Sequence, residues 1–496
     1  MARKAWKPYA ALLLAGILAW CLNTAVAPLG KPAANAACAA LAAAWLALAA
    51  VSALRRRAGR PASLAGLFAA GGFAVGLCFI LQLPHNFSWH DLASYSADFS
   101  REGTPDGHLG YIAYLAEHGL PTLNPLEEGY SVFYNPPLYH LIQAGFMKLN
   151  LWLGIPEAVA LENLQVVTFL CAQGCVLVTW DLCRLLGLGE RGQRVGVLAI
   201  AFQPSLWIFG ATLNNDILSI LCILACLLFT LRWERSRRMR DILGIGVSLG
   251  AGMAVKLSVA LLIPCIAAVF VIAFFRDQNK KRYVGQYAAF LAVSVPEAVA
   301  WPLYHLIAFQ APLNYVRLPA ETINIAGYSL WQRFGWPNWF AIRELFYTGV
   351  RKTDHNFWMQ TLKTGVYDEL TLFEKGAGMW YAAYGLMVLF ALVMTVGAVL
   401  LVRLALSRRE GLSGLSRGFL LGYAVLLLAY YVKFNVDYPY ISSANFRYIQ
   451  PVCALAALAL AAFRDKARRS AWAEALVWAF ALGCLFVYCV YFFSVI

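Results

Sequence analysis

The sequence predicts an all-α polytopic membrane protein, a bundle of about 13 transmembrane helices with two long extracytoplasmic segments. Of the 496 residues, 61% are hydrophobic and 13% are charged, and the mean hydropathy is +0.62. A soluble globular chain has about a quarter of its residues charged. The apolar residues gather in runs of about 20, long enough for an α-helix to cross ~30 Å of hydrocarbon.

The basic residues indicate how these runs are oriented. The formal net charge is +14, but Lys and Arg cluster in short blocks between apolar runs, as expected of cytoplasmic loops. This distribution disfavours a nucleic-acid partner. We expect the inner (cytoplasmic) membrane of a bacterium, with the N-terminus cytoplasmic and the C-terminus extracytoplasmic. The blocks that we place inside are residues 3–7, 55–60, 184–194, 232–240, 276–282, 403–417 and 464–469.

Residues 1–83 are expected to form the N-terminal transmembrane helices. The first apolar run follows Lys4 and Lys7, but its length of about 20 residues exceeds a typical signal-peptide core, so we interpret it as a retained helix. Residues 84–135 then form the first extracytoplasmic loop. The three crossings expected before it are 8–28, 33–54 and 62–83.

Residues 136–303 are expected to form a core transmembrane module. The stretch 136–153 is apolar but opens with two prolines, so we expect a re-entrant or interfacial helix. The run 242–275 is too long for one span and carries Lys256 in its middle, which favours two short crossings with Lys256 near the outer turn. The other expected crossings are 160–183, 193–212, 216–233 and 284–303.

A second extracytoplasmic loop, residues 304–378, precedes the C-terminal helices of residues 379–496. Four crossings follow this loop and bring the expected total to 13. An odd number of crossings places the two termini on opposite sides of the membrane. These crossings are 380–402, 418–432, 449–463 and 473–494.

Several classes of function lack support in the sequence. There is neither a Walker motif nor a Rossmann glycine pattern, so nucleotide-driven work is not indicated. No inverted repeat of the kind found in secondary transporters stands out. All twelve cysteines lie in or at the edge of apolar runs, which favours buried small side chains over a disulfide framework.

Motifs with ionisable or polar side chains gather on the side that we expect to be extracytoplasmic. "PDGHLGYIAYLAEHGLP" (105–121) and "FYNPPLYHLI" (133–142) lie in and after the first loop. "NND" (214–216) lies at an outer helix end, and "NFRYIQP" (445–451) begins a late crossing. Ionisable groups at membrane depth are costly, so a set collected on one face favours a functional site over solvated helix ends.

The order of these motifs resembles the GT-C superfamily. The resemblance is strongest to glycosyltransferase family 39-like membrane transferases, which include protein O-mannosyltransferases and the aminoarabinose transferase of lipid A. It covers residues 62–310 well and 440–455 more weakly. It implies transfer of a sugar from a polyprenyl-phosphate carrier on the outer face of the membrane.

The resemblance also implies an essential acid in the first outer loop. Asp106 matches that position, with Asp91 as its rival and Asp98 third. Many relatives have Asp-Glu here, whereas this chain has Asp106 followed by Gly107, so a second carboxylate is missing. No cofactor is therefore certain, and a divalent metal remains possible.

Glycosyl transfer needs a base for the acceptor hydroxyl and positive charge near the departing phosphate. A carboxylate such as Asp106 can act as the base. Lys256, Arg317 and Arg447 are expected to be outward cations that contact the phosphate, with His108 and His140 as weaker candidates. The remaining predicted substrate contacts are Tyr134, Asn135, Tyr139, Asn215, Asp216 and Tyr448.

Several polar and aromatic residues have a structural alternative. Tyr134, Asn135, Tyr139 and His140 are expected to present polar tips at the interface, as ligand contacts or as part of an aromatic belt. The stretch 329–340 carries Trp331, Trp336 and Trp339, which could stack on sugars or anchor an interfacial helix. Asp354 and His355 are adjacent candidate metal ligands, although a solvated loop explains them as well.

The function predicted by this reasoning is a glycosyltransferase with a polyprenyl-phosphate sugar donor and a lipid, glycan or protein acceptor. A transporter or flippase for a lipid-linked sugar is the alternative, and it should carry its ionisable groups near mid-membrane. A non-catalytic protein of envelope assembly is the third interpretation, and it predicts that neutralising Asp106 has no effect.

Overall fold

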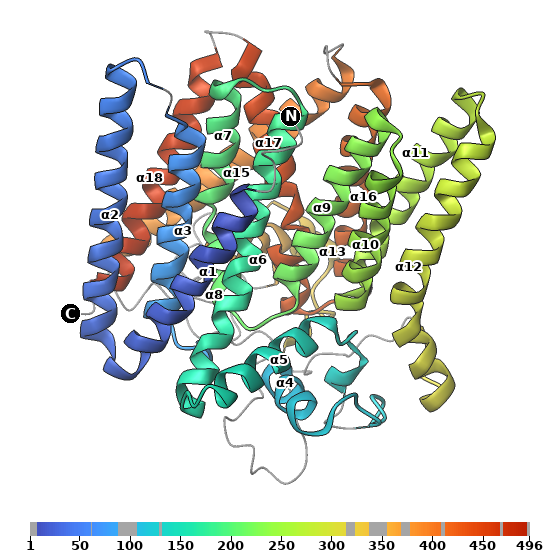
Figure 1. Ribbon diagram of the computed structural model, residues 1–496, viewed down its shortest axis with the longest axis horizontal. Helices are drawn as coiled ribbons and strands as arrows, with labels where there is room; N and C mark the ends of the chain where they lie inside the picture. The colour runs from blue at the N-terminus through green and yellow to red at the C-terminus, as the bar shows by residue number, and fades with distance from the viewer. Residues whose placement is uncertain are drawn as a thin grey trace. The chain divides into compact units, whose positions relative to one another are not determined.

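The computed structural model describes residues 7–60, 62–87, 107–127, 131–313, 323–336, 355–368, 377–407, 412–466 and 470–493. The regular structure of these residues is helical (Figure 1), and their only extended pairing is an isolated antiparallel bridge between Asn324 and Tyr440. The predicted all-α class is therefore confirmed.

The α-helices are named below in chain order, with the numbering of Figure 1. They are α1 (Lys7–Val26), α2 (Lys31–Arg57), α3 (Leu64–Gln82), α4 (Gly107–His118), α5 (Leu138–Trp152), α6 (Glu157–Leu185), α7 (Glu190–Ala201), α8 (Pro204–Ala211), α9 (Asp216–Ser236), α10 (Met239–Val255), α11 (Ile263–Arg276), α12 (Lys280–Phe309), α13 (Leu330–Phe334), α14 (Phe357–Val366), α15 (Ala377–Leu406), α16 (Gly414–Asp437), α17 (Pro451–Lys466) and α18 (Ala471–Phe493). Short 3-10 helices occupy Ala27–Leu29 (η2), Ser131–Tyr134 (η3), Leu257–Leu262 (η4), Ile441–Ala444 (η8) and Phe446–Ile449 (η9).

Ten helices in the described part of the chain are long and apolar enough to cross a membrane, or eleven if the bent pair α7 and α8 forms one span. The protein is thus a multi-pass membrane protein, but the predicted total of 13 is not confirmed. Two of the predicted crossings correspond to α10, with 17 residues, and α17, with 16. Both helices are shorter than the ten spans and are not counted among them. The ten spans are Lys7–Leu29, Lys31–Arg57, Leu64–Gln82, Glu157–Leu185, Asp216–Ser236, Leu257–Arg276, Lys280–Phe309, Gly378–Leu406, Gly414–Asp437 and Ala471–Phe492.

Two breaks within apolar runs have local causes. The run 193–212, which we expected to be one crossing, breaks between α7 and α8 with a bend of 50°. Pro204 opens α8, and proline favours a helix start because it lacks an N–H. The run 242–275 breaks at Lys256, whose extended backbone (φ −156°, ψ 124°) separates α10 from η4. Lys256 therefore lies at a break, as the sequence predicts.

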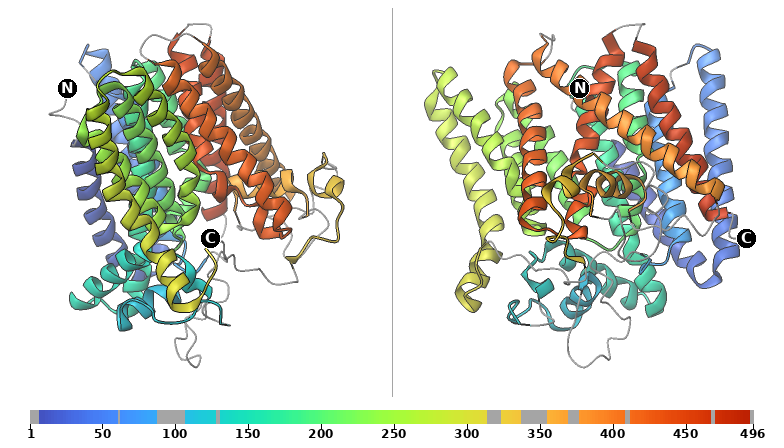
Figure 2. Two further views of the ribbon diagram at one scale, coloured as in Figure 1. Left: turned by 90° about the vertical axis from the view of Figure 1, so that its right-hand side faces the viewer. Right: turned by 180° about the vertical axis from the view of Figure 1, so that it is seen from behind.

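The chain divides into two compact units, which we describe separately. Unit 1 comprises Met1–Ala49, Phe73–Leu185 and Phe209–Val316. Within it α10 packs against α9 and α12, and α6 packs against α1 and α9. Figures 1 and 2 show α4 and α5 side by side, lying beyond one end of α6, α9 and α10. At 15 residues, α5 is not among the candidate spans.

Unit 2 comprises Ala50–Gly72, Leu186–Ile208 and Arg317–Ile496. Its centre is α17, an alanine-rich helix that packs against α7 and α15. A Cβ atom on Gly397 of α15 would lie 2.5 Å from the Cβ atom of Ala456. Small residues therefore allow α15 and α17 to approach closely, as in other membrane helix pairs.

Candidate functional site

The predicted site residues divide into those that the structure describes and those that it does not. Asp91, Asp98, Asp106 and Arg317 lie outside the described residues. The others fall in two places, around α4, α5, α9 and α10 in unit 1 and around η9 in unit 2.

The "NND" motif links the start of α9 to the end of α10. The Asn214 side-chain oxygen accepts a hydrogen bond of 2.6 Å from the backbone N–H of Asp216, the first residue of α9. The Asn215 amide donates to the carbonyl of Val255, the last residue of α10, at 3.0 Å. The two asparagines thus satisfy backbone groups that helix ends otherwise leave open.

Lys256 and Asp216 form an ion pair between these two helix ends. The Lys256 ammonium donates to Asp216 Oδ1. The Asp216 side chain is 5% exposed and the Lys256 side chain is 22% exposed. The cation that we expect to contact the phosphate is therefore held by a buried acid of the neighbouring helix end.

The start of α5 positions Tyr139 and His140. Pro137 precedes the helix, so that both residues lie in its first turn. Both side chains are fully buried, and the prediction that they present polar tips at the interface is wrong. The reason is packing, since the Gln143 amide donates to the Tyr139 hydroxyl at 3.1 Å and to the Leu164 carbonyl of α6 at 3.2 Å.

His108 of α4 and His140 of α5 form a buried pair. Their Nδ1 and Nε2 atoms lie 2.8 Å apart, and the rings stack with an interplanar angle of 11°. The Tyr111 ring also stacks on His140, with a distance of 4.2 Å between the ring centroids. Burial, with a smaller contribution from His108, holds the pKa of His140 well below its usual range. The pair therefore shares a hydrogen bond while His140 is neutral.

The loop before α5 is anchored to the end of α12. The Tyr134 hydroxyl donates to the carbonyl of Pro312 at 2.8 Å, and the Trp301 indole donates to the Tyr134 carbonyl at 3.2 Å. Asn135 closes the turn, with its amide donating to the Val132 carbonyl at 3.0 Å. Tyr134 and Asn135 are partly buried, and neither is a simple exposed tip.

One hydrophobic cluster joins these motifs. It includes Leu109 and Tyr111 of α4, Tyr139 of α5, Leu213 beside the "NND" motif and Val255 beside Lys256. Four stretches that are distant in the sequence therefore meet at one end of the unit 1 helices.

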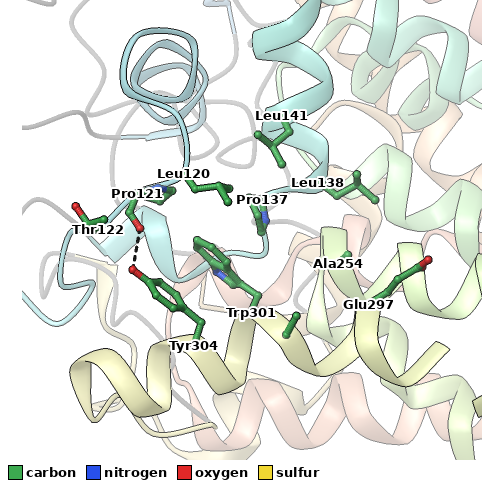
Figure 3. A pocket seen from close by; sticks show the side chains of 11 residues that line it. Leu120, Pro121, Thr122, Pro137, Leu138, Leu141, Ala254, Glu297, Trp301 and Tyr304 are labelled. Atoms are coloured by element: carbon green, nitrogen blue, oxygen red, sulfur yellow. Dashed lines mark hydrogen bonds between the residues drawn. The ribbon is translucent and has the colours of Figure 1, made fainter. Parts of the chain in front are cut away.

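Beside this cluster lies a cavity of about 470 Å³. Figure 3 shows its lining, which comes from the residues that follow α4, the start of α5, the end of α10, and α12. Tyr304 forms part of the wall, and its hydroxyl donates to the Pro121 carbonyl at 3.3 Å. The lining residues are Leu120, Pro121, Thr122, Pro137, Leu138, Leu141, Ala254, Glu297, Ala300, Trp301 and Tyr304.

In unit 2, the side chain of Arg447 is buried. Its guanidinium donates to the Tyr448 hydroxyl at 3.1 Å and lies over the Tyr448 ring. The Asn445 side chain accepts from the Arg447 N–H at 2.9 Å and donates to Asp368 at 3.3 Å. The "NFRY" motif thus forms a compact polar turn around a buried arginine.

The aromatic and metal candidates of the second loop receive little structural support. Trp331 and Trp336 are 80% and 74% exposed, and Trp339 and Asp354 lie outside the described residues. His355 stacks on Tyr328 at 4.2 Å, and burial lowers its pKa. Among the described residues, no group of three or more His, Cys, Asp or Glu side chains could hold a metal ion.

Glu297 and its cavity were not predicted from the sequence. The signal was present, since Glu297 is an acid inside the expected crossing 284–303, and ionisable residues within a span often mark function. His85 lies at the start of the expected first loop, and its backbone N–H donates to Glu162 of α6 at 2.8 Å. That contact anchors the beginning of the loop.

Comparison with known proteins supports the predicted resemblance over part of the chain. Residues 134–301, about a third of the sequence, match the family model "Dolichyl-phosphate-mannose-protein mannosyltransferase". The resemblance to the GT-C superfamily is thus confirmed for this segment, which is similar to membrane glycosyltransferases of that type. The matched segment contains Tyr139, His140, Asp216, Lys256 and Glu297.

No curated protein matches the sequence. Among solved structures, the chain is similar to the crystal structure of ArnT from Cupriavidus metallidurans in the apo state. The two share 13% sequence identity, with 75% of this chain and 70% of that chain covered, at a TM-score of 0.32. A TM-score this low supports no conclusion about fold or activity.

Proposed function

We propose that the protein is a membrane glycosyltransferase that moves a sugar from a polyprenyl-phosphate donor to an acceptor on the extracytoplasmic face. The observation that carries this proposal is the Lys256–Asp216 pair at the break after α10. It lies within the segment that matches the mannosyltransferase family model. The proposed topology keeps the N-terminus in the cytoplasm and the C-terminus outside, in the inner membrane.

A departing phosphate needs positive charge that is already in place when negative charge develops. Lys256 is suited to this role because Asp216 fixes its ammonium group and because it lies at a helix break rather than within a helix. The N-terminus of α9, which begins at Asp216, adds a positive dipole end to the same place. A lipid-linked donor already carries an activated leaving group, so a nucleotide site is unnecessary.

Asp106 is the proposed base that accepts the proton of the acceptor hydroxyl. It immediately precedes α4 in the sequence. His108, two residues later in the first turn of α4, forms a hydrogen bond with His140 of α5. This contact fixes the position of the start of α4.

The test uses purified protein in detergent with a panel of radiolabelled polyprenyl-phosphate sugars. We expect wild type to consume one donor and Asp106→Asn to consume it at least about a hundredfold more slowly, as for loss of a general base. Glu117→Gln is the matched control, because Glu117 is an exposed acid on α4. Unimpaired turnover by folded Asp106→Asn would refute the assignment of the base. Consumption of no donor by folded wild type, with candidate acceptors supplied, would count against the transferase and favour the transporter alternative.

A further inference from the structure

Glu297 is an acid at the wall of an apolar cavity. It is the only charged side chain among the eleven residues that line the cavity. Within the part of the chain that the structure describes, it forms no hydrogen bond or ion pair, and the nearby cation Lys256 is paired with Asp216. A charged group at membrane depth is costly when it has no partner, and such residues tend to mark binding sites.

The position of the Glu297 carboxyl group depends on a glycine. Gly250 of α10 faces Glu297, and a Cβ atom at position 250 would lie 2.6 Å from Glu297 Oε2. Any larger residue at that position would therefore force the carboxyl group to move. Gly250 is five residues before the end of α10, about 7 Å along the helix axis. The acid is thus placed near the end of α10 that carries Lys256.

The other residues of the cavity restrict what can bind there. Leucine, proline, alanine and tryptophan side chains make up most of the lining, so the volume suits an apolar chain. Metal ions such as Mg²⁺ and Ca²⁺ need about six oxygen ligands, and a single carboxyl group cannot supply them. An ammonium group can instead donate a charge-assisted hydrogen bond to one carboxylate. The indole of Trp301 offers a further attractive face for a cation.

We propose that this cavity binds an amine-bearing amphiphile of the membrane. The ammonium group would pair with the Glu297 carboxylate, and the apolar chain would lie between α5 and α12. Figure 3 shows Glu297 and Ala254 at one end of the lining and Pro121 and Thr122 at the other. Tyr304 is seven positions after Glu297 on α12, which gives the cavity a length of about 10 Å along that helix.

This inference does not depend on the transferase proposal, because its test measures binding. Full-length protein in lipid nanodiscs would be incubated with radiolabelled octylamine or radiolabelled octanol, and empty nanodiscs would give the background. The two probes have the same chain and differ in charge. We expect octylamine to bind wild type about tenfold to a hundredfold more tightly than octanol does, the usual range for a charge-assisted hydrogen bond.

Two variants test whether the preference for the amine comes from the Glu297 carboxylate or from negative charge elsewhere on the protein. Glu297→Gln keeps the size of the side chain, and we expect it to abolish the preference for the amine. Glu157→Gln is the matched control, since Glu157 is an exposed acid at the start of α6 with no place in the cavity, and it should leave the preference unchanged. Equal binding of both probes to wild type, or an unchanged preference in Glu297→Gln, would overturn the proposal.

A third variant keeps the test decisive if Glu297→Gln fails to fold. Ala254→Leu adds bulk to the cavity wall without changing charge, and we expect it to weaken binding of both probes at least about fivefold, as overfilling of a packed site does. Unchanged octylamine binding by folded Ala254→Leu would show that the amine binds elsewhere, and the cavity would lose its assignment.

Discussion

Replacing Lys256 by methionine tests whether the ion pair between α9 and α10 holds these helix ends together. The substitution removes the ammonium group and keeps most of the side-chain length. Removal of one partner from a buried pair costs about 3–5 kcal/mol, whereas exposed pairs contribute about 0–1 kcal/mol. Asp216 is 5% exposed and Lys256 is 22% exposed. We therefore expect Lys256→Met to lower the free energy of unfolding by about 2–3 kcal/mol, between these limits but closer to the buried case.

The assay is unfolding in mixed micelles by titration with sodium dodecyl sulfate. Seven of the twelve cysteines are buried, and none of the twelve forms a disulfide bond, so labelling by a thiol-reactive dye reports unfolding. Lys433→Met is the control, because Lys433 forms an exposed pair with Asp437 within α16. Such a pair contributes about 0.5 kcal/mol or less. A loss in Lys256→Met no larger than in Lys433→Met would refute the reasoning.

A double substitution isolates the coupling between the two side chains. Asp216→Asn removes the acid that Lys256→Met leaves without a partner, so the double variant should regain part of the stability. We expect an interaction energy of about 1–2 kcal/mol from the cycle. Lys256→Arg keeps the charge and should retain most of the stability. If its stability is retained while transfer is lost, the ammonium geometry matters to the reaction and not only to the fold.

Two further predictions concern pH and packing. Burial lowers the pKa of His140 in the folded protein. The free energy of unfolding should therefore be independent of His140 above about pH 6.5 and should fall as the pH drops below that value. The decrease should be at most about 1.4 kcal/mol per pH unit. His140→Asn should flatten this dependence in unfolding titrations between pH 7.5 and 5, and an unchanged slope would contradict the assignment. Gly365→Ala should cost about 1–3 kcal/mol, because the new methyl group would clash with Phe390 in a packed site. Gly385→Ala, which meets no atom within 4 Å, is the control, and equal stabilities would show that Phe390 moves aside freely.

The sequence predicts the helical segments well but places their ends poorly. The crossing expected over 284–303 lies within a longer helix, α12, which begins at Lys280 and ends at Phe309. The extra residues at the start are polar or aromatic (KKRY), and those at the end begin with Tyr304 and His305, which interrupt the apolar window. Asn279 caps the start by accepting from the Arg282 N–H, and Gln310 ends the helix in a left-handed conformation. These are local backbone contacts that hydropathy does not register.

The site was predicted in part for a related reason. The motifs around His108, His140 and Asp216 were expected to lie on one side, because each follows or precedes an apolar run. Their contacts were not predicted, since the pairing of side chains depends on which helices pack together. The contacts of Lys256 and Arg447 were not predicted either, because a sequence shows a charge but not the acid or ring beside it. Asp106 remains a prediction, outside the described residues.

The break after α10 and the ion pair are two consequences of one local arrangement. When α10 ends at Val255, its last carbonyl groups lose their helical partners. Asn215 donates to one of them, and the extended backbone of Lys256 turns its ammonium group toward Asp216, the next residue of the same motif. Two consecutive residues therefore have separate roles: Asn215 satisfies a backbone carbonyl at the end of α10, and Asp216 holds the Lys256 ammonium group. The charge is held in place without a rearrangement, which is the condition for stabilising a departing anion.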